Sequence, residues 1–390
     1  MNRQIPLPSL TMSGIASNRV LVAPLNWGLG HATRCVPIIK KLQAEGKEVI
    51  LTASGRSKDF LKREFPELEF VDSPHFSILY SKVFPMWMIM LLQSPRILWN
   101  IYIEHKWLNN FLERNEIDEV ISDNRYGLWS NKVRCVFITH QLMIKCPGMF
   151  QFLEPLLHRL VLQYVKKYSE CWIPDIDGKI NLSGDLSHKF KIPENTKFIG
   201  FLSRFEFSKD KAEFKTDAKN KDEVYSICFL LSGPEPLRTE LEMQIRAIEK
   251  NLPKKCLLIQ GKPETTNWDQ TGQNLIVGPH IDDMELQNIL LKTPLIVCRA
   301  GYSSIMDLKV LGRSALLIPT PGQTEQEYLA EYLSESGLFD KMLQENFGKD
   351  FISYQQNFFS RQEQKNNTSI AELTGIQNDG RSSDRIALIK

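Results

Sequence analysis

A histidine follows a glycine-rich loop near the start of the chain, where it could take a proton from a hydroxyl group. Gly28 and Gly30 precede His31, and the loop follows an apolar run, 19–24, with the composition of a buried parallel strand. A neutral imidazole at the carboxyl end of such a strand can act as a general base. The loop is expected to continue through Arg34, with a helix after it. The alternative is that His31 only caps that helix or is a polar group lining the loop.

A second titratable group stands at the end of another short apolar run. Asp123 ends the run 119–123, and a later run, 133–139, leads to further polar residues. Because the carboxyl ends of parallel strands meet at one edge of a sheet, Asp123 can reach His31 and orient its ring. The alternative is that Asp123 caps a turn. The polar residues expected near His31, on the side where a substrate hydroxyl would bind, are Asn124, Arg125 and His140.

The stretch 295–330 holds a second glycine turn, around which the second half of the chain is organised. The apolar run 295–298 is followed by Arg299, Gly301 and a helical pattern. Unpaired amide donors and the helix dipole meet at such a turn, which suits a diphosphate. Asp307 lies one helical turn after Ser303 and can accept the hydroxyls of a ribose. The alternative is an ordinary strand–helix–strand unit. Other residues that could contact a nucleotide sugar, the donor substrate this turn suits, are Gly28, Gly30, Ser232, Gly233, Ser303, Ser304, Gln323, Gln326 and Glu327.

Repeated units of strand, turn and helix must position these groups. They run through 18–205 and again through 223–345, which predicts an α/β protein with two domains. The charged segment 206–222 is the expected linker. Residues 1–17 are expected to form a loose leader without the features of a signal peptide. The segment 346–390 is expected to be a tail that is polar and partly disordered from residue 360 on, and a helix near Phe351 that returns to the first domain is the alternative for its start.

Composition excludes several functional classes. A chain of 390 residues with 42% apolar and 24% charged residues is typical of soluble globular proteins. A net charge of +2 gives no reason to expect a nucleic-acid partner. The seven cysteines include no CxxC pair and lie mostly in apolar runs, which indicates reduced core residues of a cytoplasmic protein.

Two other features have competing interpretations. Asp175 and Asp177 have the spacing of a carboxylate pair that holds a divalent ion on a diphosphate, but we interpret them as part of a solvated turn. The segment 84–92 is rich in Met, Trp and Ile and is too short to span a bilayer. We interpret it as a buried helix of the first domain, and a lipid-facing patch is the alternative.

Both glycine loops resemble those of glycosyltransferase family 28. The second turn falls in order on the nucleotide-sugar signature of that family, and the first falls on a glycine loop that ends in His. Two positions depart from the pattern, because Asp307 replaces the usual Glu and Glu327 replaces the usual second Gln. The residues that carry the resemblance are Gly28, Gly30, His31, Cys298, Arg299, Gly301, Ser303, Ser304, Asp307, Gln326 and Glu327.

The resemblance implies the GT-B fold, in which two doubly wound Rossmann-like domains face a cleft. The donor would bind mainly to the second domain, with backbone near Ile281 holding its base. The implied activity is that of an inverting glycosyltransferase (a hexosyltransferase). It would move a sugar, with N-acetylhexosamine as a candidate, from a nucleoside diphosphate donor, with UDP as the expected nucleotide. The acceptor would be a hydroxyl group, with a lipid-linked or cell-envelope glycan as the candidate.

In the implied mechanism His31 deprotonates the acceptor, and Arg299 offsets the charge of the leaving diphosphate. No cofactor or metal would be required. A lipid-linked acceptor would place the protein in the cytoplasm at the inner face of the membrane, as a peripheral membrane protein. Two alternatives stay open: a nucleotide-sugar 2-epimerase of the same fold, which needs further carboxylates, and a non-catalytic nucleotide-sugar-binding module.

Overall fold

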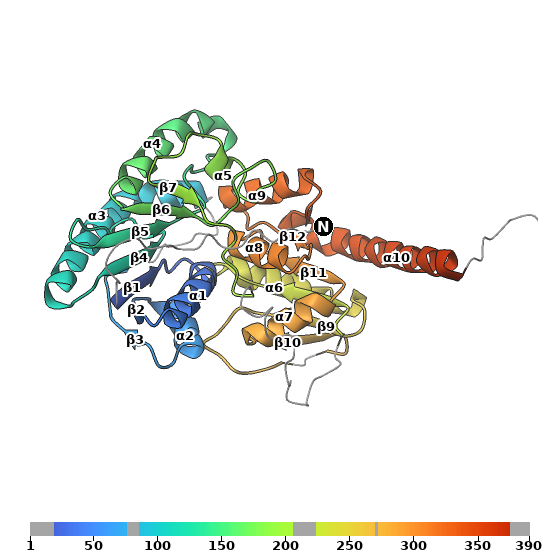
Figure 1. Cartoon of the computed structure of the whole chain (residues 1–390). Coiled ribbons are helices and arrows are strands. Elements are labelled where there is room, and N and C mark those ends of the chain that lie inside the picture. Colours follow the sequence, from blue (N-terminus) through green and yellow to red (C-terminus); the bar gives the residue numbers. More distant parts are fainter. Residues whose placement is uncertain (1–18, 76–85, 206–223, 270–271, 375–390) are drawn as a thin grey trace, which may run out of the picture. The chain divides into compact units, whose positions relative to one another are not determined.

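The computed structural model describes residues 19–75, 86–205, 224–269 and 272–374 (Figure 1). The expected leader, 1–17, and the expected linker, 206–222, lie outside the described residues. The chain divides into two compact units after Gln344, and the first unit contains two parallel sheets with their helices.

The first sheet has seven parallel strands in the order β3-β2-β1-β4-β5-β6-β7. Successive strands are added outward on both sides of β1, as in a doubly wound sheet. β1 and β4 are neighbours in register, with Pro24 opposite Asp123, so both end at the same edge. The strands are β1 Arg19–Pro24, β2 Glu48–Leu51, β3 Glu69–Phe70, β4 Glu119–Asp123, β5 Arg134–Ile138, β6 Glu170–Ile173 and β7 Thr196–Phe198.

Helices cover both faces of this sheet, which explains why its strands are continuous apolar runs. On one face Val20 and Val22 pack with α1 and α2, and on the other Leu21 and Ala23 pack with α3 and α4. The helices are α1 Leu29–Ala44, α2 Gly55–Glu64, α3 Met86–Arg114, η1 Gly148–Leu153, α4 Glu154–Val165 and α5 Asp185–His188.

The second sheet has six parallel strands in the order β10-β9-β8-β11-β12-β13. Its order also changes direction at the first strand, between β8 and β11, and this confirms the prediction of two doubly wound α/β sheets. The strands are β8 Ile227–Leu230, β9 Cys256–Ile259, β10 Leu275–Gly278, β11 Leu295–Cys298, β12 Leu316–Leu317 and β13 Asp340–Lys341. The helices are α6 Leu237–Ala247, η3 Glu249–Asn251, α7 Asp283–Lys292, α8 Tyr302–Val310, α9 Thr324–Glu335 and η4 Gln344–Asn346.

Three segments differ from what the sequence led us to expect. The loop that was expected to continue through Arg34 ends earlier, because Gly28, with a φ of 88°, allows α1 to begin at Leu29. The helix named as an alternative near Phe351 is present as α10, Phe347–Thr374, and it continues into the part of the tail that was expected to be partly disordered.

The prediction of a buried helix at 84–92 is wrong for the part of the segment that the structure describes. Leu91 and Leu92, near the start of α3, are 65% and 69% exposed. The reason is that α3 packs on the sheet farther along, where Leu108 is fully buried. Among the described residues no helix is both long and apolar enough to cross a membrane.

Candidate functional site

The neighbouring ends of β1 and β4 bring His31 and Asp123 into contact. Nδ1 of His31 lies 2.8 Å from Oδ1 of Asp123, and the His31 side chain is 14% exposed while Asp123 is buried. Nη2 of Arg34 also lies 3.0 Å from Nδ1 of His31, but this group already donates to Oδ1 of Asp123. Because an ionised carboxylate only accepts hydrogen bonds, we assign the proton of His31 to Nδ1, and Nε2 keeps its lone pair. Within the part of the chain that the structure describes, Nε2 of His31 makes no hydrogen bond. The ring is therefore held ready to accept a proton.

Arg34 lies one turn after His31 on α1, and its guanidinium group binds both carboxylate oxygens of Asp123. Burial alone would raise the pKa of Asp123, but the charges of Arg34 and His31 and their hydrogen bonds lower it to about 2. Asp123 is thus ionised at every pH at which the protein would work. Arg34 was not among the site residues predicted from the sequence, although its i, i+3 spacing from His31 places it on the same side of a helix.

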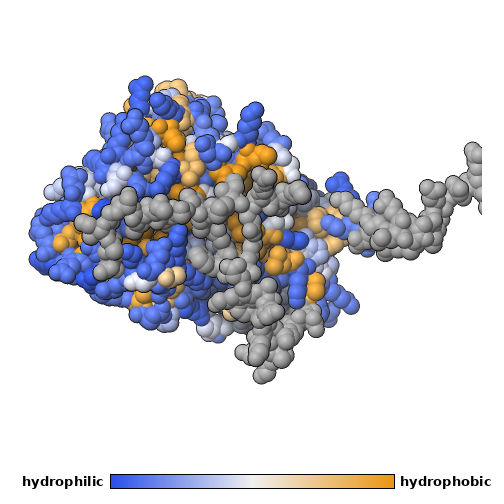
Figure 2. All heavy atoms as spheres, in the orientation of Figure 1, coloured by the Kyte–Doolittle hydropathy of each residue, from blue (hydrophilic) through white to orange (hydrophobic). Residues whose placement is uncertain are grey.

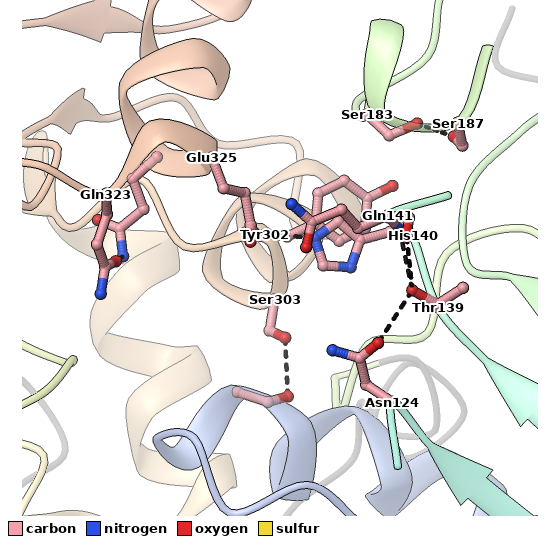
Figure 3. A network of polar contacts seen from close by, with 12 residues as sticks. Asn124, Thr139, His140, Gln141, Ser183, Ser187, Tyr302, Ser303, Gln323 and Glu325 are labelled. Carbon is pink, nitrogen blue, oxygen red and sulfur yellow. Dashed lines mark hydrogen bonds and ion pairs between the residues drawn. The ribbon is translucent and has the colours of Figure 1, made fainter. Parts of the chain in front are cut away.

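His140 extends this cluster. Its Nδ1 lies 3.0 Å from Nη1 of Arg34, and because arginine only donates, Nδ1 must accept. The proton is therefore on Nε2, which donates to Oε1 of Glu325 at 2.9 Å. The ring stacks on Tyr302, with centroids 4.0 Å apart, and burial lowers the pKa of His140 (Figure 3). Glu325 was also not predicted from the sequence, although it lies between the predicted site residues Gln323 and Gln326.

The other expected acceptor-side residues are placed differently from one another. Asn124 follows β4 with a φ of 57° and accepts a hydrogen bond from Thr139, which orders the turn beside His140. Arg125 is buried, and its guanidinium group binds Glu104 at 2.9 Å and the carbonyl of Pro74 at 2.7 Å. The charge of Arg125 is thus used to hold segments of the first domain together.

The two glycine loops meet through Ser303 and Gly30. The Ser303 hydroxyl, in the first turn of α8, donates to the carbonyl of Gly30 at 2.8 Å (Figure 3). A Cβ atom at Gly30 would lie 3.0 Å from Oγ of Ser303, so a side chain there would press on this contact. Gly301 is the N-cap of α8 and has open space around it, so the free amides of the first turn, including that of Ser304, can face an anion.

Arg299 does not point into that open space. Its side chain is 1% exposed and donates to the carbonyls of Leu237, Ile318 and Pro319 at 2.7 to 3.3 Å. Burial lowers the pKa of Arg299 to about 10. In this conformation the guanidinium group ties the start of α6 to the end of β12, and the expected contact with a diphosphate would need it to leave these carbonyls.

Asp307 is also occupied by groups of the protein. Its carboxylate accepts from Oγ of Ser203 at 2.6 Å and from Nε of Arg204 at 3.1 Å, and Arg204 also binds Asp283 at 2.9 Å. Burial raises the pKa of Asp307 despite these partners. The expected ribose-binding acid is therefore buried and neutralised by Arg204.

The remaining expected donor residues lie in loops that follow β8, β10 and β12, or in the first turns of α8 and α9. Gln326 accepts from the amide of Thr320 at 2.9 Å and donates to Gln323 at 2.6 Å, and Glu327 accepts from the amide of Gly322 at 2.8 Å. These side chains order the loop before α9. Ile281 is buried, and Ser232, Gly233 and Ser304 are half-buried.

The carboxylate of Asp175 is saturated by its own turn. It accepts from the amides of Ile176 and Ser183, each at 2.8 Å, and from the amide of Leu182. Asp177 is exposed. The triplet forms a turn as expected, but Asp175 is fully buried in it, so the interpretation as a solvated turn is wrong for that residue.

Comparison with known proteins points to one family of enzymes. Residues 240–379 match the sequence model described as "Glycosyltransferase family 28 C-terminal domain". Over 66 residues the chain is 39% identical to UDP-N-acetylglucosamine--N-acetylmuramyl-(pentapeptide) pyrophosphoryl-undecaprenol N-acetylglucosamine transferase of Desulforudis audaxviator, which is 16% of this chain and 17% of that protein. The protein of the same name from Acetivibrio thermocellus is 35% identical over 81 residues, 20% of this chain and 21% of its own length. The chain thus spans about a fifth of the curated relatives it matches.

Solved structures agree on the fold. Acinetobacter baumannii MurG has a TM-score of 0.50 at 13% identity, covering 88% of this chain and 90% of its own. The spinosyn rhamnosyltransferase SpnG, complexed with thymidine diphosphate, has a TM-score of 0.54 at 14% identity and covers 92% of both chains. The likeness extends over both sheets and confirms the predicted GT-B fold.

Proposed function

We propose that this chain, which carries a family 28 carboxy-terminal domain on a GT-B fold, is a glycosyltransferase. The observation that supports this most is the His31–Asp123 pair, with Nε2 unpaired, on a loop that contacts the first turn of α8 through Ser303. The pair can supply a base, and the helix terminus can supply a site for a diphosphate. The contact between the two loops supports the proposal, because a transferase needs its base close to the bound diphosphate.

In the proposed reaction an acceptor hydroxyl attacks the anomeric carbon of the donor in line. Nε2 of His31 takes the hydroxyl proton as the new glycosidic bond forms, and the bond between the anomeric carbon and the diphosphate oxygen breaks. The nucleoside diphosphate leaves with the electron pair, and the configuration inverts. The carboxylate of Asp123 stabilises the imidazolium ion, and the amides of the first turn of α8 face the departing charge.

A UDP-linked N-acetylhexosamine is the donor we propose. The support is that curated relatives are named for a UDP-N-acetylglucosamine reaction and that a structural neighbour was solved with thymidine diphosphate. The amides of Ser303 and Ser304 would contact the diphosphate, with Gly301 leaving room for it. Asp307 can accept a ribose hydroxyl only if it shares or gives up Arg204.

A lipid-linked acceptor is supported by exposed apolar side chains on the first domain. α3 and α4 pack on the same face of the first sheet, so their outer faces lie on the same side of that domain. Figure 2 shows apolar atoms exposed among charged ones near the top of the view, where α4 lies in Figure 1. The exposed apolar residues of these helices and of η1 are Leu91, Leu92, Leu98, Trp99, Tyr102, Met149, Phe152, Leu156 and Leu160.

Exposed basic residues on and after α4, Arg159, Lys166 and Lys167, suit an anionic lipid surface. We propose peripheral contact with the inner face of a membrane. Vesicles of phosphatidylglycerol and phosphatidylcholine should sediment the wild-type protein but less of a Trp99→Ser/Phe152→Ser variant. Met243→Ser, an exposed apolar position on α6, is the matched control. Equal sedimentation of all three proteins would contradict membrane contact by this surface.

The epimerase and the non-catalytic module are less well supported. An epimerase needs further carboxylates at the reacting sugar, whereas Asp307 is bound to Arg204 and Glu325 to His140. A module that has lost turnover has no need of a histidine oriented by a buried carboxylate. The three functions give different products, so one experiment can separate them.

The test is incubation of the purified protein with UDP-N-acetylglucosamine, UDP-N-acetylgalactosamine, UDP-glucose and dTDP-glucose, with product analysis by proton NMR. A transferase should release nucleoside diphosphate by slow hydrolysis and bind UDP in calorimetry. An epimerase would convert the sugar without releasing it, and a binding module would bind without either change. The proposal would be overturned if the protein bound none of these donors and released nucleoside diphosphate from none of them.

A further inference from the structure

We propose that Glu325 and His140 are positioning residues. Through them, the contact between the two domains orients the base His31. Glu325 belongs to the second domain, and the other members of the cluster belong to the first. The inference deepens the proposed function and rests on it, because it says how the donor-binding half of the protein acts on the catalytic group of the other half.

The start of α9 is docked on the first domain at several points. The hydroxyl of Thr324 donates to the carbonyl of Lys145 at 2.8 Å, and the hydroxyl of Tyr328 accepts from the amide of Asp185 at 2.6 Å. Glu325 lies between them and reaches Nε2 of His140 at 2.9 Å. The three contacts come from one helical turn, so the position of Glu325 follows from the position of the whole helix end.

The chain from Glu325 to His31 has one consistent pattern of donors and acceptors. The carboxylate accepts from Nε2–H of His140, so Nδ1 of that ring is free to accept from Arg34 at 3.0 Å. The other donors of Arg34 then bind Asp123, whose Oδ1 accepts from His31 at 2.8 Å. Without Glu325, His140 can adopt the other tautomer, which turns an N–H toward the donors of Arg34.

Charge balance supports the same assignment. With Glu325 the cluster holds two carboxylates and one guanidinium group, so its net charge is −1 with neutral His31 and zero after His31 takes a proton. Without Glu325 the same step would leave a net positive charge in a largely buried cluster, where charges are poorly screened. Glu325 therefore favours the protonated His31 of the transition state.

The position of His140 is fixed by more than this chain. Its ring stacks on Tyr302, the first residue of α8, at 4.0 Å and an interplanar angle of 5° (Figure 3). The hydroxyl of Tyr302 donates to the carbonyl of Pro174 at 2.9 Å, so both domains hold the stacked pair. Because the ring of His140 is held in place by this stacking, loss of Glu325 should change its tautomer more than its position.

The kinetic test compares Glu325→Ala and Glu325→Gln with the control Glu335→Ala, an exposed position on the same helix. Glu325→Ala should lower kcat by about tenfold while the KM for the donor stays within about twofold. Glu325→Gln keeps an oxygen that accepts from Nε2–H and should recover part of the loss. Glu335→Ala should behave as wild type.

The decisive arm is the same substitution on a His31→Ala background. If Glu325 acts through His31, the double variant should be no slower than His31→Ala alone, because the two losses are not additive. Additive losses, or a loss of donor affinity on Glu325→Ala, would overturn the inference. Either result would assign Glu325 to donor binding or to stability.

Ring nitrogen NMR gives a readout that does not need activity. The chain has seven histidines, so the signals of His31 and His140 can be assigned from their alanine variants. Glu325→Ala should shift the ring nitrogens of both, and Glu335→Ala of neither. A spectrum in which His140 shifts and His31 does not would overturn the coupling. Absence of any turnover in the wild type would overturn the proposed function alone, since the spectrum still decides the coupling.

Discussion

His31 donates from Nδ1 to Oδ1 of Asp123 at 2.8 Å, although 92 residues separate the two in the sequence. The contact exists because β1 and β4 are neighbours that end at the same edge of the first sheet. It fixes the tautomer of His31 and leaves Nε2 as the accepting atom. The predictions below follow from this contact and from the groups that surround it.

Asp123→Asn should destabilise the fold as well as slow the reaction. The asparagine side chain has the shape of the carboxylate, but its NH₂ group is a donor. That group would have to face an N–H group of His31 or of Arg34, which are donors as well. Arg34 would also stay buried without its counter-charge. We expect the free energy of unfolding to fall by about 3 kcal/mol, measured by urea denaturation. Asp177→Asn, at an exposed position, is the control, and equal midpoints for both variants would contradict the prediction.

Stability should rise with pH through the acidic range. The pKa of Asp123 is about 2 in the fold against an ordinary 3.8, so its contribution is present above 3.8 and is lost as pH falls toward 2. Burial lowers the pKa of His140 below its ordinary 6.5, so the unfolded chain binds a proton there first as pH falls below 6.5. Both groups therefore favour unfolding in acid.

The contribution of His140 can be separated by substitution. Urea midpoints measured between about pH 5 and 7 should depend less on pH in His140→Gln than in the wild type, because glutamine does not titrate. The same dependence in both proteins would show that other groups determine the slope.

Asp307→Asn should affect both donor binding and stability. We expect the affinity for UDP to fall by about 1.5 to 3 kcal/mol in calorimetry, the scale of a charge-assisted hydrogen bond. Stability should also fall, because Arg204 would lose one of the two carboxylates that bind its guanidinium group. Asp283→Asn is the control for the loss of a partner of Arg204. If both variants weakened UDP binding equally, the effect would come from Arg204 and Asp307 would not be a ribose ligand.

Turnover should survive removal of divalent metal. The carboxylate of Asp175 is already used by the amides of its own turn, so it is poorly placed to hold an ion on a diphosphate. EDTA should leave the rate of donor hydrolysis unchanged, and so should Asp177→Ala. A rate lost on chelation and restored by Mn²⁺ or Mg²⁺ would show that the proposed mechanism lacks a metal.

The sequence was sufficient to predict the fold and the place of the first two site residues. Strands buried on both faces read as apolar runs, and their order along the chain predicts parallel sheets with loops at one edge. The same reasoning predicts that Asp123 lies within reach of His31. Arg34 was missed because the helix was expected to start later, and only a helical start puts it one turn from His31.

The remaining differences come from contacts that no local pattern encodes. Glu325 contacts His140 although 185 residues separate them and they follow strands of different sheets. Arg299 and Asp307 lie at the expected positions of the turn, but the first binds backbone carbonyls and the second binds Arg204. Spacing predicts where a side chain begins, whereas its partners depend on how the loops of both sheets pack.

The central claim is that His31 is the base of a glycosyl transfer, and the turnover of His31→Ala tests it most directly. The rate should be measured at saturating donor, beside calorimetry of UDP binding to the same protein. We expect kcat to fall by about 10² to 10⁴-fold, the usual loss of a general base, while UDP affinity stays within about twofold. A kcat close to that of the wild type, or a parallel loss of UDP affinity and rate, would contradict the claim.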